Sequence, residues 1–366
     1  MPDKTSATAA KLYEEAGVAS VNLQRGFISL IEQLKATFGS GARNPLLAFG
    51  HFANVLDIGY PKAIAISTDG VGTKAIVAQM LDRYDTIGID CVAMNANDIL
   101  CVGAEPIAMV DYIAVEAADD ELLSEIGKGL VEGARRANIT VPGGEISQIP
   151  QIIQSHRPRR GFDLVGTCIG IVDKDRLVTG EKIEPGDVIL GLASSGIHSN
   201  GFTLARKALF EEAHYALDED ISGLGGSLGD ELLEPTRIYV PEVLRMLKEA
   251  LEIKALVHIT SDGFLNLARV THRIGFVIEF LPEPPPIFSL IQELKHVPDS
   301  EMFLVYNMGV GFCVIASPES VERVLEIAKE ADYEAWRLGH CVEDSEKRVW
   351  LKPKGLVGKD GKFFPA

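Results

Sequence analysis

The sequence places a short polar turn and a long apolar segment next to one another in residues 67–106, STDGVGTKAIVAQMLDRYDTIGIDCVAMNANDILCVGAEP. The run just before it, residues 62–66, is mostly apolar and leads into Asp69, which predicts a buried strand running into a turn. Gly70 and Gly72 allow the backbone to turn sharply and to approach a ligand closely. This part of the chain therefore predicts a strand followed by a tight, ligand-accessible turn.

Lys74 comes directly after this glycine-containing turn. The Gly-x-x-x-x-Gly-Lys-Ser/Thr spacing of a P-loop is absent here. From the turn alone, two interpretations stand equally: a turn that binds a ligand, and a plain tight turn followed by an exposed lysine.

Residues 87–102 predict a helix, because they contain no proline and Gly103 stands where a helix would end. At about 100° per residue, one stripe of this helix carries Asp90, Met94, Asn97, Asp98 and Cys101. The simpler interpretation is an amphipathic helix with its polar groups in water. The stripe lacks Lys, Arg and Glu, however, and includes Met and Cys, which prefer burial. Half-buried carboxylates and an amide suit Mg²⁺, which is usually held together with substrate phosphates.

Two later turns are also rich in glycine. Residues 139–141 predict a short strand, and Gly143 and Gly144 after it permit close backbone approach. Glu145 can accept a hydrogen bond from a ligand or lie near the metal. Both of these roles for Glu145 stay open at this point.

Residues 194–201, SSGIHSNG, lie between a predicted strand and a predicted helix at 202–210. Ser199 or Asn200 is expected to cap that helix. The N-terminus of a helix, beside serine hydroxyls and glycines, can bind an anion without a positive side chain, and a plain capped turn is the alternative. His198 can donate to a phosphate or transfer a proton. The glycine-rich residues 211–233 that follow show little periodicity and predict a loop.

Composition limits the classes of partner. The chain has 366 residues, which suggests two domains, and it carries 35 Lys and Arg against 52 Asp and Glu, a net charge of −17. This charge argues against nucleic acid or an anionic membrane as the partner. An acidic protein that handles phosphates must do so with cations and backbone amides.

The five cysteines are odd in number and show no Cys-x-x-Cys spacing, which predicts reduced thiols. The N-terminus has no apolar core of the signal-peptide type, and no run approaches the roughly 18 apolar residues of a membrane-spanning helix. We therefore expect a cytoplasmic protein.

Several short motifs, in this order, resemble those of the aminoimidazole ribonucleotide synthetases, also called phosphoribosylformylglycinamidine cyclo-ligases. They are TDGVGTK at 68–74, DTIGID at 85–90, Asn97-Asp98, GAEP at 103–106, GGE at 143–145, SSGIHSNG at 194–201, EPTRIY at 234–239 and YNMGVG at 306–311. The resemblance covers nearly the whole chain. It implies that ATP and Mg²⁺ are used to convert formylglycinamidine ribonucleotide into aminoimidazole ribonucleotide in purine synthesis. It also implies a homodimer joined through strands of the first domain.

The motifs and the resemblance together define a set of expected site residues. The expected catalytic residues are Asp98, His198 and Lys74. The expected metal ligands are Asp69, Asn97, Asp98 and Glu145. The expected contacts to ATP and phosphate are Asp69, Gly70, Gly72, Thr73, Gly143, Gly144, Ser194, Ser195, Gly196, Ser199, Asn200 and Asn307.

The chain departs from the family pattern at two places. Ile146 stands where the family has a threonine, and Ser261 and Asp262 stand where it has glycines. Asp262 would repel a phosphate placed against this loop. Two alternatives therefore remain: another ATP-dependent phosphotransferase of the superfamily, such as thiamine-phosphate kinase or selenophosphate synthetase, and a non-catalytic nucleotide-binding relative.

The expected fold is α/β, of the α+β type, with two domains. Residues 1–175 are expected to form an N-terminal domain with a mixed sheet, which binds ATP and Mg²⁺ and makes the dimer contact. Residues 176–366 are expected to form a C-terminal α/β synthetase domain that ends in a loose tail. The expected ligand is a small phosphorylated molecule.

Overall fold

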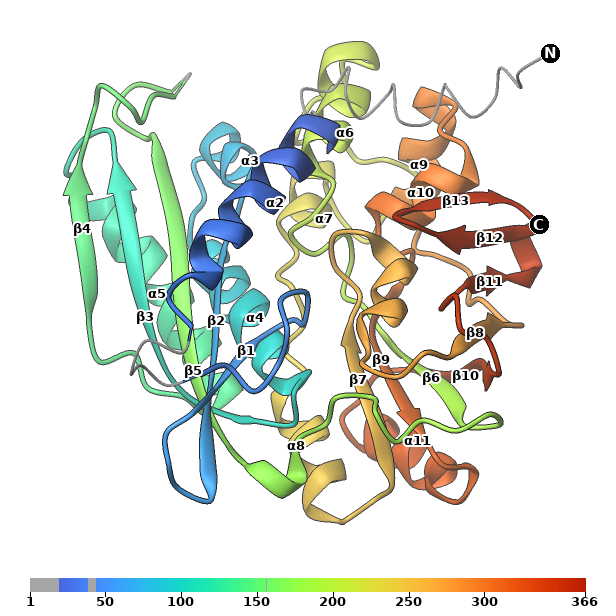
Figure 1. The fold of residues 1–366 in the computed structure, drawn as a ribbon. Helices are drawn as coiled ribbons and strands as arrows, with labels where there is room; N and C mark the ends of the chain where they lie inside the picture. The colour runs from blue at the N-terminus through green and yellow to red at the C-terminus, as the bar shows by residue number, and fades with distance from the viewer. Residues whose placement is uncertain (1–19, 39–43, 156) are drawn as a thin grey trace.

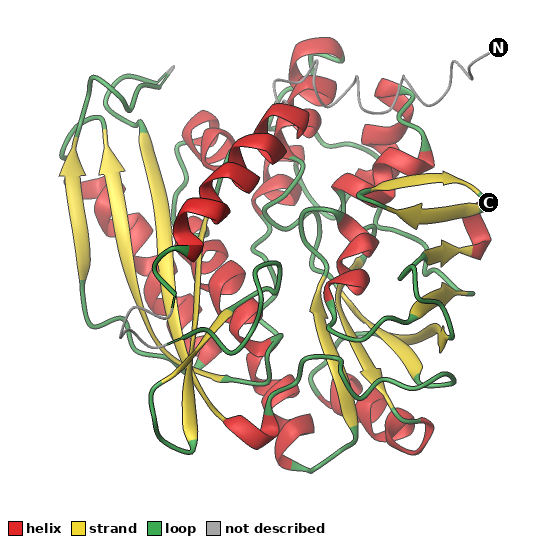
Figure 2. Cartoon of the chain, viewed as in Figure 1, coloured by secondary structure: helices red, strands yellow, loops and turns green. Residues whose placement is uncertain are grey.

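The chain folds into two β-sheets that stand side by side, each with helices packed against it (Figures 1 and 2). The computed structural model describes residues 20–38, 44–155 and 157–366, with side chains described from residue 28 onward. The two sheets with their helices confirm the expected two-domain fold of the α+β type. The chain passes from one sheet to the other within residues 174–187, and the boundary at residue 175 stays a prediction.

The first sheet has the strand order β1-β2-β5-β3-β4, in which β3 and β4 pair in parallel and the other neighbours are antiparallel. Its strands are β1 (Asn54–Asp57), β2 (Lys62–Gly70), β3 (Glu105–Val115), β4 (Gly144–Gln148) and β5 (Phe162–Asp173). Buried and half-buried residues alternate along β5. This alternation is typical of a sheet that is covered on one face only.

Helix α4 (Ile87–Leu100) packs on the covered face of this sheet, against α5 (Asp120–Ala137). Glycines allow the two helices to approach closely, because a Cβ atom on Gly88 would lie 2.1 Å from the backbone of α5. Nearly every residue of α4 is buried, since the helix also contacts the second half of the molecule. The helix is confirmed, and the interpretation that its polar stripe faces water is wrong. Two further helices complete this half: α2 (Ser20–Lys35) and α3 (Lys74–Leu81).

The second sheet has the order β13-β12-β11-β8-β10-β6-β9-β7, with β8 and β11 parallel and the other pairs antiparallel. Its strands are β6 (Val188–Ala193), β7 (Ile253–His258), β8 (Gly275–Ile278), β9 (Val310–Ala316), β10 (Ala335–Val342), β11 (Val349–Leu351), β12 (Leu356–Lys359) and β13 (Lys362–Pro365). Its helices are α6 (Phe202–Arg206), α7 (Leu228–Leu233), α8 (Val240–Lys248), α9 (Pro286–Lys295), α10 (Asp299–Val305) and α11 (Val321–Glu330). All of β9 is buried, as expected of an apolar strand covered on both faces.

Two predictions of local structure were wrong at turns. The strand expected at 139–141 lies instead at β4, where Gly144 pairs with Asp111 of β3. Residues 211–233 were expected to form a loop, but they include α7, whose N-cap Ser227 accepts a hydrogen bond from the backbone N–H of Asp230. A serine followed by acidic residues is a helix-start signal that the glycines of this segment obscured.

The loose tail expected after residue 352 is also wrong. Strands β12 and β13 form an antiparallel hairpin at the edge of the second sheet. Asp360 and Gly361 both have positive φ angles, 51° and 76°. An Asp-Gly pair at the centre of a two-residue turn is the strongest short-range hairpin signal.

The five cysteines are buried and free, as the sequence predicted. In the ranges given above, each helix is too short or too polar to cross a bilayer.

Candidate active site

The turn after β2 meets loops of the second half of the molecule. We call this contact the seam and define it by residues 68–73, 98, 198–203 and 258–262. Thr73 Oγ1 lies 3.2 Å from Thr203 Oγ1 across it. The seam therefore brings together motifs that are far apart in the sequence.

Two carboxylates lie near each other at the seam. Burial raises the pKa of Asp69 to about 6, and the neighbouring charge of Asp98 adds to the rise. Asp69 Oδ1 accepts a hydrogen bond from the backbone N–H of Gly70 at 2.7 Å. Asp98 differs from the rest of α4 in being partly exposed. Two like charges in a poorly solvated place favour a bound cation or a proton between them, so this pair is a candidate cation site.

Lys74 is completely buried, so the alternative of an exposed lysine is wrong. Its Nζ lies 2.9 Å from Asp90 Oδ2 and donates to the carbonyl oxygen of Glu234 at 2.6 Å. Asp90 Oδ1 accepts from the N–H and Oγ1 of Thr236, at 2.8 and 2.6 Å, and from Ser199 Oγ at 3.2 Å. Both charges are thus met by protein groups, and the network joins the two halves. The catalytic role of Lys74 stays a prediction.

Asn97 uses its amide between backbone groups. Its Nδ2 donates to the carbonyl oxygen of Arg237 at 2.9 Å, and its Oδ1 accepts from the N–H of Tyr239 at 3.0 Å. The side chain is fully buried. The oxygen that was expected to bind metal therefore has another partner, and Asn97 fixes the start of α8 on α4.

The turn at residues 194–201 is closed by its own side chains. The N–H of Ser195 donates to His198 Nε2 at 3.2 Å, and Ser195 Oγ donates to the carbonyl of Pro235 at 2.6 Å. His198 is almost completely buried, and burial lowers its pKa well below the usual value. Because Nε2 accepts, the proton of the neutral ring lies on Nδ1. This Nδ1 has no hydrogen-bond partner among the described residues.

Asn307 braces the same turn from the strand β9 side. Its Nδ2 donates to the carbonyls of Gly196 and Ile197 at 2.8 and 3.1 Å, and its Oδ1 accepts from the N–H of Gly309 at 2.9 Å. Asn307 thus supports the turn, and its direct contact with a phosphate stays a prediction. The Oγ of Ser194 is buried and lacks a partner in the part of the chain that the structure describes.

The predicted N-cap of α6 is wrong. Helix α6 begins after Gly201, whose φ is 78°, and no side chain caps it. Ser199 Oγ is bound to Asp90, as described above, and Asn200 contacts the loop after β7. Helix α6 has five residues and continues as a π-helical turn at Lys207–Glu212. It is too short to supply an anion site of its own.

The departures at Ser261 and Asp262 form specific contacts. Asn200 Nδ2 donates to Thr260 Oγ1 at 2.6 Å, and Ser261 Oγ donates to Asn200 Oδ1 at 2.8 Å. Asp262 has a φ of 70°, a conformation that glycine adopts freely and aspartate tolerates. Its carboxylate lies 3.3 Å from the guanidinium of Arg269. The guanidinium of Arg269 therefore offsets the negative charge of Asp262, which stands where the family pattern has a glycine.

Gly143, Gly144 and Glu145 lie at the far edge of the first sheet (Figure 1). Strands β5 and β3 separate β4 from β2, which corresponds to roughly 14 Å at the usual spacing of strands. Glu145 therefore cannot share a metal ion with Asp69 inside one chain. Glu145 could act as a metal ligand at the seam only in an assembly in which a second copy of the chain brings it there. That role stays a prediction.

Family models match both halves of the chain: the N-terminal domain of AIR synthase related proteins over residues 50–172, and their C-terminal domain over residues 184–352. A phosphoribosylformylglycinamidine cyclo-ligase of Methanobrevibacter smithii is 46% identical over 336 residues, which cover 92% of this chain and 95% of that protein. One of Pyrococcus horikoshii is 45% identical over 348 residues, 94% of this chain and 99% of that protein. The chain belongs to the cyclo-ligase family.

Solved structures show the same fold at low identity. The HypE–HypF complex matches with a TM-score of 0.58 at 18% identity, covering 87% of this chain and 95% of that chain. Phosphoribosylformylglycinamidine synthase II of Thermotoga maritima matches with a TM-score of 0.55 at 16% identity, covering 88% and 46%. These matches support the fold assigned to this cyclo-ligase family member.

The carboxylate pair of this family member fits a Mg²⁺ ion bound with a nucleotide. Within the described residues, no three His, Cys, Asp or Glu side chains converge as a ligand group. Mg²⁺ does not require such a group, because it usually binds one or two carboxylates together with waters and substrate phosphates. Burial, together with the neighbouring charge of Asp98, raises the pKa of Asp69, so a bound cation would offset the repulsion between the two carboxylates.

Sequence reasoning missed His258, the last residue of β7. Its Nδ1 lies 2.9 Å from Asp98 Oδ1. It also missed that Asp90 pairs with Lys74 and accepts hydrogen bonds from Thr236. A histidine at the end of an apolar strand, just before a turn, was the available signal for His258, whereas no local signal connects Asp90 with Thr236.

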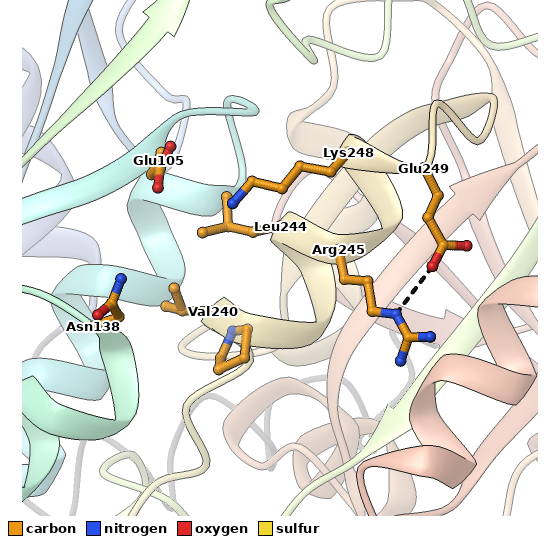
Figure 3. Close-up of a pocket in the computed structure, with 8 residues that line it drawn as sticks. Glu105, Asn138, Val240, Leu244, Arg245, Lys248 and Glu249 are labelled. Carbon is orange, nitrogen blue, oxygen red and sulfur yellow. Dashed lines mark hydrogen bonds and ion pairs between the residues drawn. The ribbon is translucent and has the colours of Figure 1, made fainter.

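A separate pocket of about 350 Å³ lies between α8 and the ends of α5 and β3 (Figure 3). It is lined by Glu105, Asn138, Val240, Pro241, Leu244, Arg245, Lys248 and Glu249. Arg245 donates to Glu249 at 3.0 Å, so its charge is already paired. The residues of the seam do not line this pocket, and we do not assign the reaction to it.

Proposed function

We propose that this chain is an ATP-dependent cyclo-ligase that converts formylglycinamidine ribonucleotide into aminoimidazole ribonucleotide, the imidazole-forming step of purine synthesis. The observation that carries the proposal is the match to cyclo-ligases along almost the whole chain. The carboxylates of Asp69 and Asp98 at the seam support it, because they suit the binding of a metal–nucleotide complex.

The chemistry needs ATP because an amide oxygen is a poor leaving group. Phosphorylation of that oxygen by ATP gives a group that leaves as phosphate when the neighbouring amine attacks the carbon. The products are the ring, ADP, phosphate and a proton. In such transfers a protein acts mainly by positioning the reactants and stabilising charge.

The residues of the seam can be given roles in this reaction. Asp69 and Asp98 would hold the Mg²⁺ ion, which when bound neutralises charge on the transferring phosphoryl group. His198 presents its Nδ1–H as a neutral donor, because burial keeps the ring uncharged. Asn200 and Thr260 would line the phosphate side of the seam, where their side chains already hold each other.

An oxygen-labelling experiment tests the proposal. Substrate carrying ¹⁸O at the formyl-amide carbonyl is incubated with the purified protein, ATP and Mg²⁺, and the released phosphate is analysed by mass spectrometry. We expect one labelled oxygen in phosphate for each ring formed. Label that appears only in water would contradict the phosphorylation route.

The same experiment distinguishes the two alternatives. A phosphotransferase of the superfamily would leave a phosphoryl group on its product, so no ¹⁸O from the amide would enter free phosphate. A non-catalytic relative would release neither phosphate nor ring. Asp98→Asn serves as the control, because it keeps the shape of the side chain and removes its charge.

We also propose that the protein acts as a homodimer in the cytoplasm. The face of the first sheet that α4 does not cover exposes large apolar side chains at Val110 and Tyr112, with exposed fractions of 43% and 39%. An apolar patch of this kind on a sheet usually marks a contact with another protein. A second copy of the chain is the partner that the family resemblance implies.

A further inference from the structure

His258 reaches from the second half of the molecule to the carboxylate of Asp98 in the first half. Its Nδ1 lies 2.9 Å from Asp98 Oδ1. The imidazole is 1% exposed and the carboxylate 14% exposed, so the histidine lies behind the aspartate as seen from solvent. This bond makes the position of a first-half carboxylate depend on a second-half strand.

The geometry also fixes how the two groups share a proton. An ionised carboxylate only accepts hydrogen bonds, so Nδ1 of His258 carries the proton and donates it to Oδ1. This hydrogen bond uses Oδ1, and among the described residues Oδ2 of Asp98 makes no hydrogen bond or ion pair, so Oδ2 is available to a ligand.

The imidazole is held in place by its surroundings. His258 ends β7, where it pairs with Phe312 of β9, and the two rings lie 6.2 Å apart. Its Nε2 is buried and has no hydrogen-bond partner within the ranges that the structure describes. Among the described residues, the hydrogen bond to Asp98 is therefore the polar contact of the buried imidazole ring.

We propose that His258 is a positioning residue for the metal site: it holds Asp98 so that Oδ2 faces the divalent cation that accompanies ATP. The inference rests on the proposed function, because it assumes that Asp98 binds that cation. Hydrogen bonds to a metal-binding carboxylate or imidazole orient the ligand, and their loss typically weakens metal binding by about 10- to 100-fold. His258 itself does not touch the nucleotide.

The test measures binding of Mn²⁺, used as a probe for Mg²⁺, by electron paramagnetic resonance in the presence of saturating ADP. His258→Phe keeps an aromatic ring against Phe312 and removes the donor, and we expect its Mn²⁺ affinity to fall about 10- to 100-fold. His258→Asn can place its amide N–H where Nδ1 lies, and we expect its affinity to stay within a few-fold of the unmodified protein. A folded His258→Phe protein with unchanged Mn²⁺ affinity would overturn the proposal.

A second pair of variants keeps the test decisive if His258→Phe does not fold. His258→Gln carries its amide one bond further from the backbone, near the place of Nε2, and cannot reproduce the bond to Asp98. We expect Mn²⁺ to bind at least ten times more weakly to His258→Gln than to His258→Asn. Equal affinities of these two variants would show that the donor position is irrelevant and would reject the role of His258.

Asp98→Asn separates this inference from the proposed function. If Asp98→Asn loses Mn²⁺ while the His258 variants keep it, the metal site stands and only the role of His258 fails. If Asp98→Asn binds Mn²⁺ like the unmodified protein, the assignment of the metal to Asp98 fails first. Circular dichroism and the melting temperature of each variant show whether its fold is intact.

Discussion

Lys74 Nζ lies 2.9 Å from Asp90 Oδ2, and neither side chain is exposed to solvent. The pair joins the first residue of α3 to the first turn of α4, and the carbonyl of Glu234 and the hydroxyl of Thr236 complete its hydrogen bonds from the second half. A lysine that follows a glycine turn thus serves here as an internal connection between the two halves of the molecule.

Replacing Lys74 by methionine is expected to destabilise the protein strongly. The change leaves the Asp90 carboxylate buried without its charge partner, which typically costs about 3–5 kcal/mol. Unfolding in urea, followed by circular dichroism, measures the loss. Lys128→Met removes a comparable but exposed ion pair with Glu125 and is the control, with little change expected. Normal stability together with lost ATP turnover in Lys74→Met would instead establish the catalytic role that the sequence suggested.

The buried position of His198 leads to a second prediction. His198→Ala leaves the N–H of Ser195 without its acceptor, so we expect a loss of about 1–3 kcal/mol in the free energy of unfolding. His198→Gln can restore an acceptor near the position of Nε2 without the Nδ1 donor. We expect His198→Gln to regain stability but not turnover, as measured by melting temperature and kcat. Full turnover in His198→Gln would exclude Nδ1 as a catalytic donor.

Apolar periodicity predicted most of the elements around the seam, because each depends on burial of one face. The helix at α4 and the strands β2 and β6 follow directly from their apolar residues. The hairpin β12–β13 was missed although its Asp360-Gly361 turn was visible in the sequence. That signal was local and could have been used.

The candidate site was predictable only in part, because its contacts join residues far apart in the chain. The oxygen-bearing stripe on α4 indicated half-buried carboxylates, and Asp98 is the partly exposed residue of this helix. The same stripe could not show that Asn97 binds the backbone at 237–239, or that Asp90 binds Lys74. These assignments depend on which side of α4 the second half covers, and only the tertiary packing sets that.

The pKa of Asp69 gives a prediction for pH dependence. Its pKa is raised to about 6, so the folded protein binds this proton more tightly than the unfolded chain does. The contribution of this group to stability is therefore full below its ordinary pKa of 3.8 and is lost as the pH rises through about 6. Cation binding needs the ionised form, so Mn²⁺ affinity should instead fall as the pH drops through about 6.

Melting temperatures between pH 5 and pH 7.5, with and without Mn²⁺ and ADP, measure both effects. The ligand-induced rise in melting temperature should be larger at the higher pH. Asp69→Asn should remove most of this pH dependence, because the amide does not titrate. A ligand-induced shift that is independent of pH in the unmodified protein would exclude Asp69 from the cation site.

The face of the first sheet that α4 does not cover is the proposed dimer interface, and a single charge placed on it should prevent dimer formation. Val110→Asp places a carboxylate on this face, and its desolvation in an interface should leave the protein monomeric in light scattering coupled to size-exclusion chromatography. Val131, on α5, is 70% exposed but lies on another surface. Val131→Asp should therefore leave the dimer intact. A monomeric unmodified protein, or a dimer that tolerates Val110→Asp, would contradict this interface.

Asp262 allows the departure from the family pattern to be tested directly. Its φ of 70° suits glycine, so Asp262→Gly should fold at least as well as the unmodified protein. The change removes a negative charge at the seam and frees the guanidinium of Arg269, which lies 3.3 Å from the carboxylate. We expect inorganic phosphate and the phosphorylated substrate to bind several-fold more tightly, as measured by isothermal titration calorimetry.

Two further variants decide whether charge is the cause. Asp262→Asn removes the charge and keeps the side chain, so it should reproduce the gain in affinity if repulsion is responsible. Asp360→Gly changes another aspartate with a positive φ, 51°, in the turn between β12 and β13, and should leave phosphate binding unchanged. The gain should shrink at high salt, because exposed charges are screened. If Asp262→Gly and Asp262→Asn both bind phosphate like the unmodified protein, the loop at 260–263 does not face the phosphate, and the substrate must be held elsewhere along the seam.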